Sequence, residues 1–164
     1  MFFDNIKLFD LAWEVKIDDK RYFFSHAGVR KGWFDKWVKD RLIRWDGDDL
    51  PDAERFNELF HSAYDDRRNF DKQSTHDFET AIGIYSTYRG WSGWPDGSIV
   101  WADIKEYVSK VAGELKNDYE NVVFICGHTQ LRNEPVIGEW VMDLDCRRSF
   151  VLDTGTGKVE EYKY

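Results

Sequence analysis

The sequence predicts a mixed α/β fold that forms a single domain over residues 1–164. Apolar, strand-like runs lie near both ends of the chain, and segments between them carry apolar residues at helical spacing. No repeat, low-complexity stretch or linker divides the chain. A domain of this length buries roughly 68–70% of its unfolded surface, which is enough for a hydrophobic core.

Two strands, followed by helices, are expected in the N-terminal part. Residues 13–17 and 21–25 are predicted as a strand pair joined by a short turn. The spacing of apolar residues predicts helices over 33–45 and 52–64. Residues 65–98 are polar, aromatic and glycine-rich without a clear period, so we expect a long structured excursion of the kind that often carries function.

The C-terminal part is richer in strands. It begins with the clearest predicted helix, over 102–115, whose apolar face consists of Ile104, Val108, Val111 and Leu115. Residues 121–126 form a continuous apolar run, which is typical of a strand covered on both sides. Antiparallel strands are expected over 139–144, 149–152 and 158–162.

The composition excludes several kinds of partner. The formal net charge is −8 and the isoelectric point about 5.0, so no basic stripe is available to bind a nucleic-acid backbone. No apolar stretch approaches the ~20 residues that span a membrane, and the first residues do not form a secretory signal. Two cysteines, Cys126 and Cys146, suggest no disulfide framework and fit a reducing compartment, so we expect a cytoplasmic protein.

Two histidines follow strand-like runs and are the leading candidates for a site. His26 comes directly after the strand predicted over 21–25, and His128 comes just after the apolar run 121–126. Sites in open α/β sheets are built at the carboxyl ends of strands. Two histidines there can converge on one metal ion, with a nearby glycine allowing the backbone to turn sharply. The alternative for each histidine is a hydrogen-bonded structural role.

Four short motifs occur in a defined order. They are His26-Ala27-Gly28, Trp101-Ala102-Asp103, Gly127-His128-Thr129, and an aspartate followed by small residues, either Asp145-Cys146 or Asp153-Thr154-Gly155. Together they resemble the C-terminal half of a calcineurin-like metallophosphoesterase, in the branch of phosphoprotein phosphatases and diadenosine tetraphosphatases. The resemblance covers residues 12–156. It implies half of a four-layer α/β/β/α sandwich, with a mixed sheet and antiparallel C-terminal strands.

Carried over residue by residue, the resemblance implies that His26 and His128 ligate the second of two divalent ions, which would be Mn, Fe or Zn. Gln130 stands where many members of the family have a further histidine, and the phosphoprotein-phosphatase branch lacks that histidine too. The implied activity is hydrolysis of a phosphomonoester or phosphoprotein by a metal-bound hydroxide, without a covalent enzyme intermediate. A phosphorylated substrate is therefore the expected partner.

The chain also departs from the family. The family motifs DxH, GDxxDRG and GNH(D/E), which carry the other ligands, precede the first matched histidine, and none occurs in the 25 residues before His26. We therefore expect the N-terminal metal-binding half to be absent from this chain and to come from upstream sequence or a second polypeptide. Two neutral imidazoles without a carboxylate hold a hard divalent ion weakly, so metal binding and activity of this chain alone are expected to be weak.

The departure leaves a second class of function open. Half of a sandwich exposes a sheet edge and an apolar face, which a stable chain must cover. The alternative is therefore a non-catalytic remnant that acts as an oligomeric binding or interaction module, with a homo-oligomer as the expected state.

Three arginines are weighed as contacts for a substrate phosphate, and one cysteine as a nucleophile. Arg89 is the candidate contact for the substrate phosphate, because an arginine grips a phosphate through two donors; stacking on Trp91 or Trp94 is the alternative. Arg147 and Arg148 are adjacent on a predicted strand, so at most one of them faces the site. Cys126 is interpreted as a core thiol rather than a nucleophile, and no residue is assigned as catalytic.

Overall fold

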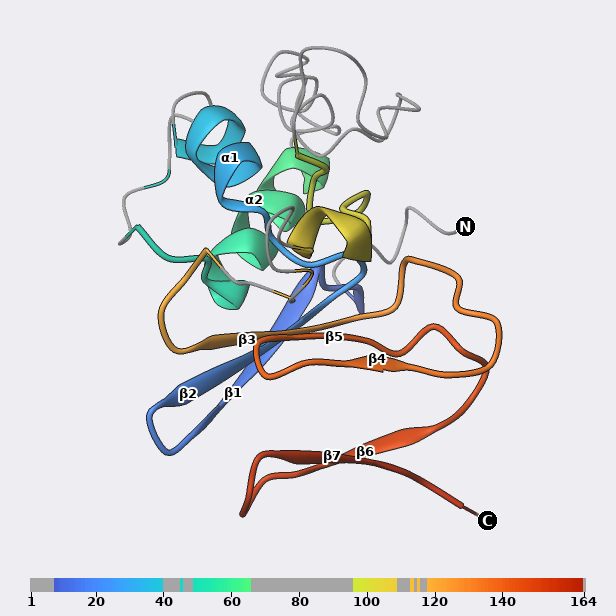
Figure 1. Cartoon of the computed structure of the whole chain (residues 1–164). Helices are drawn as coiled ribbons and strands as arrows, with labels where there is room; N and C mark the ends of the chain where they lie inside the picture. Colours follow the sequence, from blue (N-terminus) through green and yellow to red (C-terminus); the bar gives the residue numbers. More distant parts are fainter. Residues whose placement is uncertain are drawn as a thin grey trace.

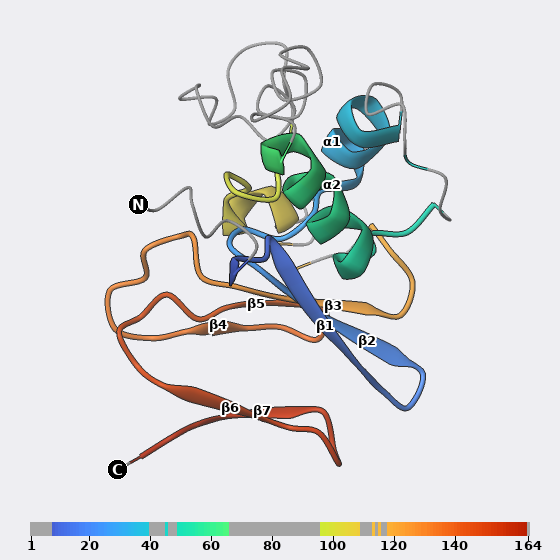
Figure 2. The same ribbon diagram turned by 180° about the vertical axis from the view of Figure 1, so that it is seen from behind.

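A computed structural model of the chain describes residues 8–39, 45, 49–65, 96–108, 113, 115 and 118–163. In these ranges a five-stranded mixed sheet has helices on one face and a two-stranded antiparallel sheet on the other (Figures 1 and 2). The mixed α/β class and the antiparallel C-terminal strands are therefore confirmed. The described residues form three layers, so the four-layer sandwich stays a prediction. None of the described helices is long and apolar enough to cross a membrane.

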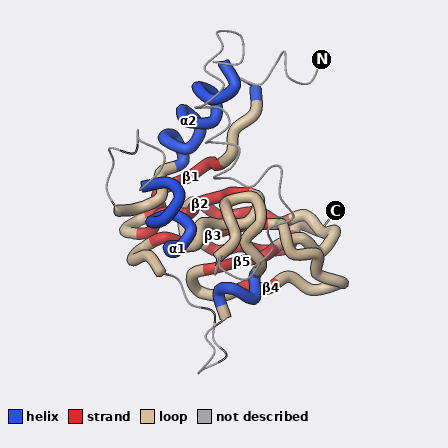
Figure 3. The backbone as a smooth tube through the Cα atoms, turned by 90° about the horizontal axis from the view of Figure 1, so that it is seen from above, coloured by secondary structure: helices blue, strands red, loops and turns tan. Residues whose placement is uncertain are grey.

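The large sheet has the strand order β1-β2-β3-β5-β4, which is visible from the helical side in Figure 3. The predicted hairpin is present, with β1 (Ala12–Ile17) antiparallel to β2 (Lys20–Ser25). β3 (Val122–Cys126) pairs in parallel with both β2 and β5 (Val141–Asp143), and β4 (Val136–Ile137) is antiparallel to β5. Every residue of β3 is buried, as its continuous apolar run predicted.

The helical layer covers one face of this sheet. It consists of α1 (Lys31–Trp33), a π-helix over Phe34–Lys39 and α2 (Ala53–Asp65). The helix predicted over 52–64 is confirmed, and the amide of Arg55 donates to the Asp52 carboxylate at its start, 2.7 Å away. The helix predicted over 33–45 begins slightly earlier, and its residues 40–44 lie outside the described ranges. Phe56 of α2 packs on Phe23 of β2 at a ring-centroid distance of 6.3 Å.

The helix predicted over 102–115 is wrong beyond its first turn. In the described part of this range the structure has a 3-10 helix over Ile104–Tyr107, after which Val108 is extended and pairs with Leu115 in an antiparallel bridge. Residues 109–112 and 114, which include Val111, lie outside the described ranges. Asp103 and Glu106 form a capping box, and Glu106 also accepts a hydrogen bond from the amide of Gly97. The capping box starts the short helix, and the bridge between Val108 and Leu115 replaces the helix that the apolar spacing predicted further along.

The second sheet packs against the opposite face of the large sheet. Its strands are β6 (Phe150–Asp153) and β7 (Lys158–Glu161), whose Leu152 and Val159 pack against a buried cluster formed by Ile17, Tyr22, Val123, Ile125 and Met142. Gly157, with a φ of 69°, lies directly against the Tyr22 hydroxyl, which leaves no room for a side chain.

Replacement of Phe124 in β3 tests this core. The Phe124 side chain is 0% exposed and packs on Phe23 and Tyr119, with ring centroids 5.6 and 5.8 Å away. We expect Phe124→Ala to lower the free energy of unfolding in urea by about 3–5 kcal/mol, because it leaves a cavity among these rings. The control is Val151→Ala at a side chain that is 49% exposed, which should change that free energy by less than about 0.5 kcal/mol. Equal losses in both variants would contradict the assigned core.

Candidate functional site

The parallel pairing of β2 and β3 brings the two candidate histidines together. Both strands end at the same edge of the sheet, so the loops that follow them are neighbours. Nε2 of His26 lies 2.8 Å from Nδ1 of His128, although the residues are 102 positions apart. The ring centroids are 4.8 Å apart, with the rings edge-on at 70°. A backbone hydrogen bond from the Gly127 amide to the His26 carbonyl, 3.0 Å long, joins the two loops.

The two histidines differ in their surroundings. His128 is buried, and the ring of Trp101 packs edge-on against it at a centroid distance of 5.5 Å. His26 is exposed to solvent. The pair is therefore accessible from one side and supported by protein on the other. The Trp101 motif thus lies beside the second histidine.

The loop after His26 requires a glycine. Gly28 has a φ of 79°, and its amide donates to the Ser25 hydroxyl 2.9 Å away. A side chain at Gly28 would collide with the Tyr107 hydroxyl, whereas Ala27 is fully buried and its amide donates to the Ile99 carbonyl. The small residues after His26 thus allow the chain to turn tightly beneath the ring pair.

A buried carboxylate that sequence reasoning missed lies beside His128. Asp143, at the end of β5, is 0% exposed and accepts hydrogen bonds from the amides of Thr129 and Asp145, at 3.2 and 3.1 Å. Burial raises the pKa of the Asp143 carboxyl, and the hydrogen bonds from Asp145 and Thr129 oppose this shift. The available signal was an aspartate directly after the apolar residues Val141 and Met142 of a strand.

The two aspartates that sequence reasoning did name occupy different places. The Cβ of Asp145 is 4.0 Å from the point that a Cβ at Gly127 would occupy, so Asp145 adjoins the His128 loop. Asp153 closes the turn between β6 and β7 instead, and the hydrogen bond from the Gly155 amide helps to hold the pKa of its carboxyl below the usual range. Of the two alternatives for the fourth motif, the geometry favours Asp145-Cys146.

The histidine pair lies near the spacing of two metal ligands. Two imidazole nitrogens that each lie about 2.0–2.1 Å from one tetrahedral ion are about 3.3–3.4 Å apart. The observed separation of 2.8 Å is about half an ångström shorter, so the rings would move slightly apart to bind an ion. Among the described residues, no group of three or more histidine, cysteine, aspartate and glutamate side chains is placed to hold an ion. The described part of the chain therefore offers two candidate ligands, and the same two nitrogens form an ordinary hydrogen bond when one of them carries a proton.

The three arginine candidates differ in what the structure shows of them. Arg89, with Trp91 and Trp94, lies outside the described residues. Arg148 forms ion pairs with Glu134 at 2.7 Å and Glu161 at 3.3 Å. Its neighbour Arg147 is exposed and has a left-handed backbone with a φ of 62°.

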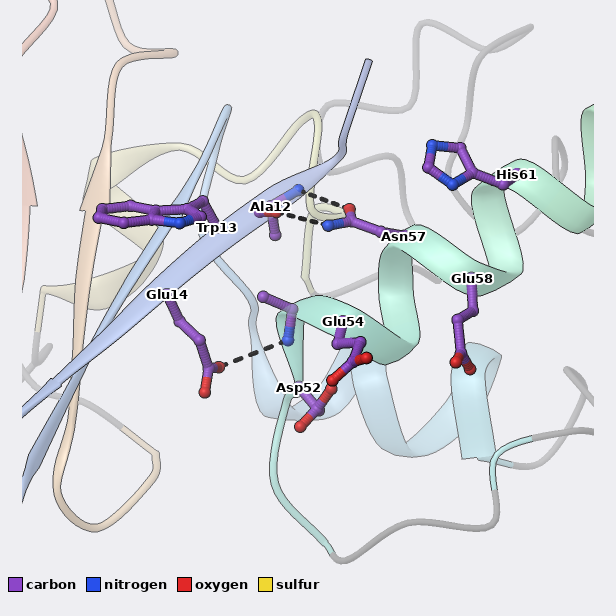
Figure 4. Close-up of a pocket in the computed structure, with 9 residues that line it drawn as sticks. Ala12, Trp13, Glu14, Asp52, Glu54, Asn57, Glu58 and His61 are labelled. Atoms are coloured by element: carbon purple, nitrogen blue, oxygen red, sulfur yellow. Dashed lines mark hydrogen bonds between the residues drawn. The ribbon is translucent and has the colours of Figure 1, made fainter. Parts of the chain in front are cut away.

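Two grooves of about 430 Å³ lie on the surface around β1. One adjoins the histidine pair: His26 forms part of its wall, together with the apolar side chains of Trp13, Phe24 and Ile125. The other lies between β1 and α2, where Asn57 binds the backbone of Ala12 (Figure 4). Its wall is acidic and contains neither His26 nor His128, so it is separate from the candidate site.

Comparisons of the chain with known protein families, with curated proteins and with solved structures find no match. The resemblance to metallophosphoesterases therefore rests on the sequence motifs alone.

Thiol reactivity tests the interpretation of the cysteines. Cys126 is buried, its thiol donates to the Met142 carbonyl 3.3 Å away, and burial raises the pKa of that thiol. Cys146 is also buried and free. We expect neither thiol to react with Ellman's reagent in the folded protein and both to react in denaturant. Ser149→Cys, at an exposed position, is the positive control, and rapid labelling of Cys126 in the folded protein would contradict the core assignment.

Proposed function

We propose that this chain forms part of a metal-dependent phosphoesterase in which His26 and His128 ligate one divalent ion, Mn, Fe or Zn. The observation that carries the proposal is the convergence of their ring nitrogens to 2.8 Å from the ends of two neighbouring parallel strands. The motif order around these histidines supports the same family. The proposed architecture is the C-terminal half of a four-layer sandwich, and the proposed substrate is a phosphomonoester or phosphoprotein.

The chain's own residues would bind and orient the ion. The buried His128 is held from behind by Trp101, whereas the exposed His26 faces the side from which a substrate approaches. A divalent ion polarises a phosphoryl oxygen and lowers the pKa of water. Both facing nitrogens must be unprotonated to bind it, so each imidazole keeps its remaining proton on the far nitrogen. Carboxylate ligands from outside the described residues would complete the centre.

Metal titration tests the two ligands. We expect the metal-free chain to bind Mn²⁺ weakly, and His26→Ala and His128→Ala each to lose at least about tenfold in affinity, as measured by calorimetry or electron paramagnetic resonance. His61→Ala is the matched control, because His61 lies on α2 and hydrogen-bonds the Phe9 carbonyl instead. Failure of the unaltered chain to bind Mn²⁺, or binding that both alanine variants retain, would overturn the assignment.

Hydrolysis of p-nitrophenyl phosphate tests whether this chain alone is catalytically active. Because two ligands hold a hard ion weakly, we expect slow Mn²⁺-dependent turnover at most, removed by EDTA and by His128→Ala. Turnover at the rate of a complete phosphatase would mean that the chain assembles its full set of ligands itself. Mn²⁺ binding without turnover would mean that the centre needs ligands from elsewhere.

A second candidate function has its own structural support. Trp13 is 58% exposed on β1, an edge strand of the described sheet, and it lies against Phe24 at a centroid distance of 5.0 Å. An exposed aromatic surface beside a sheet edge is a common docking site. We propose that this surface is covered by a second copy of the chain or by a partner, which is the role expected of an interaction module.

Light scattering after size exclusion tests that surface. We expect a homo-oligomer, and Trp13→Ser should shift it toward the monomer because it removes apolar contact area. The control is Ile137→Ser, at a side chain that is 52% exposed on the opposite edge strand β4. A monomer at high concentration, or equal effects of the two substitutions, would argue against self-association through Trp13.

A further inference from the structure

Asp143 is a fully buried carboxylate with both oxygens engaged. Oδ2 accepts from the Thr129 amide and Oδ1 from the Asp145 amide. No lysine or arginine in the part of the chain that the structure describes forms an ion pair with it. A buried carboxylate without a cation is costly, and an apolar side chain would fill the same space at the end of β5. What a carboxylate adds there is two acceptors for the amides of two different loops.

Those hydrogen bonds act next to a candidate ligand. Thr129 directly follows His128, and its hydroxyl as well as its amide hydrogen-bonds Asp143. The same hydroxyl accepts a hydrogen bond from the Ile104 amide, 3.0 Å away. A continuous polar chain therefore runs from the end of β5, through Thr129, to the segment that follows Trp101.

This polar chain restrains His128 from two directions. Thr129 fixes the backbone on one side of the histidine, and the Gly127 amide is fixed on the other side by its bond to the His26 carbonyl. The Ile104 anchor lies three residues after Trp101, whose ring packs edge-on against the imidazole. These contacts surround an imidazole whose Nδ1 faces His26.

We propose that Asp143 is a positioning residue, which acts through the Thr129 amide and hydroxyl to fix the His128 ring with Nδ1 toward His26. The consequence for metal affinity rests on the proposed function, whereas the orientation of the ring does not. Hydrogen-bond partners around a ligand usually tune its affinity, because they fix the direction in which its lone pair points.

Four variants of the full chain separate this role from a structural one. Asp143→Asn keeps the shape but leaves one acceptor oxygen for two amides. Thr129→Val removes the hydroxyl, and Thr129→Ser restores it. Asp153→Asn is the matched control, since Asp153 also accepts a backbone amide but lies in the turn between β6 and β7.

Two measurements are made on each variant: Mn²⁺ affinity, and the imidazole ¹⁵N chemical shifts of His128 in the metal-free protein. We expect Asp143→Asn and Thr129→Val to weaken Mn²⁺ binding about 10–100-fold and to move the ¹⁵N shifts of His128 toward a mixture of tautomers. Thr129→Ser and Asp153→Asn should match the parent in both. Thermal unfolding shows how far each variant is destabilised.

Asp143→Asn that is destabilised yet keeps the parental ¹⁵N shifts and Mn²⁺ affinity would overturn the proposal and leave Asp143 a purely structural role. If the parent itself does not bind Mn²⁺, the proposed function fails, but the ¹⁵N shifts still decide the positioning role. If Asp143→Asn does not fold, the comparison of Thr129→Val with Thr129→Ser tests the positioning role. Identical ¹⁵N shifts of His128 in these two variants would overturn the proposal.

Discussion

The parallel pairing of β2 with β3 is the contact on which both the fold and the candidate site depend. It aligns Phe23 with Phe124 and Phe24 with Ile125, over a separation of about one hundred residues. Side chains alternate between the faces of a strand, so this pair supplies Phe23 and Phe124 to the helical core and Tyr22 and Val123 to the cluster under β6 and β7. The same register sets the two histidines at one edge. A slip of one residue would exchange the two faces and separate the rings.

Sequence reasoning succeeded where local pattern and tertiary structure agree. The hairpin, the buried strand before His128 and α2 all carry periodicities that match their final environment, and parallel strands necessarily end at one edge. Sequence reasoning failed where contacts between different segments determine the conformation. The helix predicted over 102–115 is one case, because Val108 is extended and pairs with Leu115, which a continuous helix does not allow. Asp143 was missed because only the position of β5 beside β3 distinguishes it from Asp145.

Two polar side chains are buried together at one edge of the sheet. Among the described residues, the buried polar side chains are Ser98, His128 and Asp143, and the last two lie at the carboxyl ends of neighbouring strands. Burying polar groups opposes folding unless their hydrogen bonds are satisfied. Here the Asp143 carboxylate accepts hydrogen bonds from two amides, and the His128 imidazole hydrogen-bonds a second imidazole. A fold tends to break its own packing rules at a functional site, and the buried pair His128 and Asp143 agrees with a site at this edge of the sheet.

The pair of proposed ligands and an exposed apolar groove lie side by side. His26 is both a member of the ring pair and part of the wall of the groove formed by Trp13, Phe24 and Ile125. The helices already cover one face of the large sheet, and β6 and β7 pack on the other face through Leu152 and Val159. An element laid in the groove would therefore bury Trp13 and would end beside the exposed imidazole. If that element carries carboxylates, it completes the coordination of a hard cation at the same step. The two proposed functions are then linked, because docking at Trp13 would be the event that converts a weak pair of ligands into a working centre.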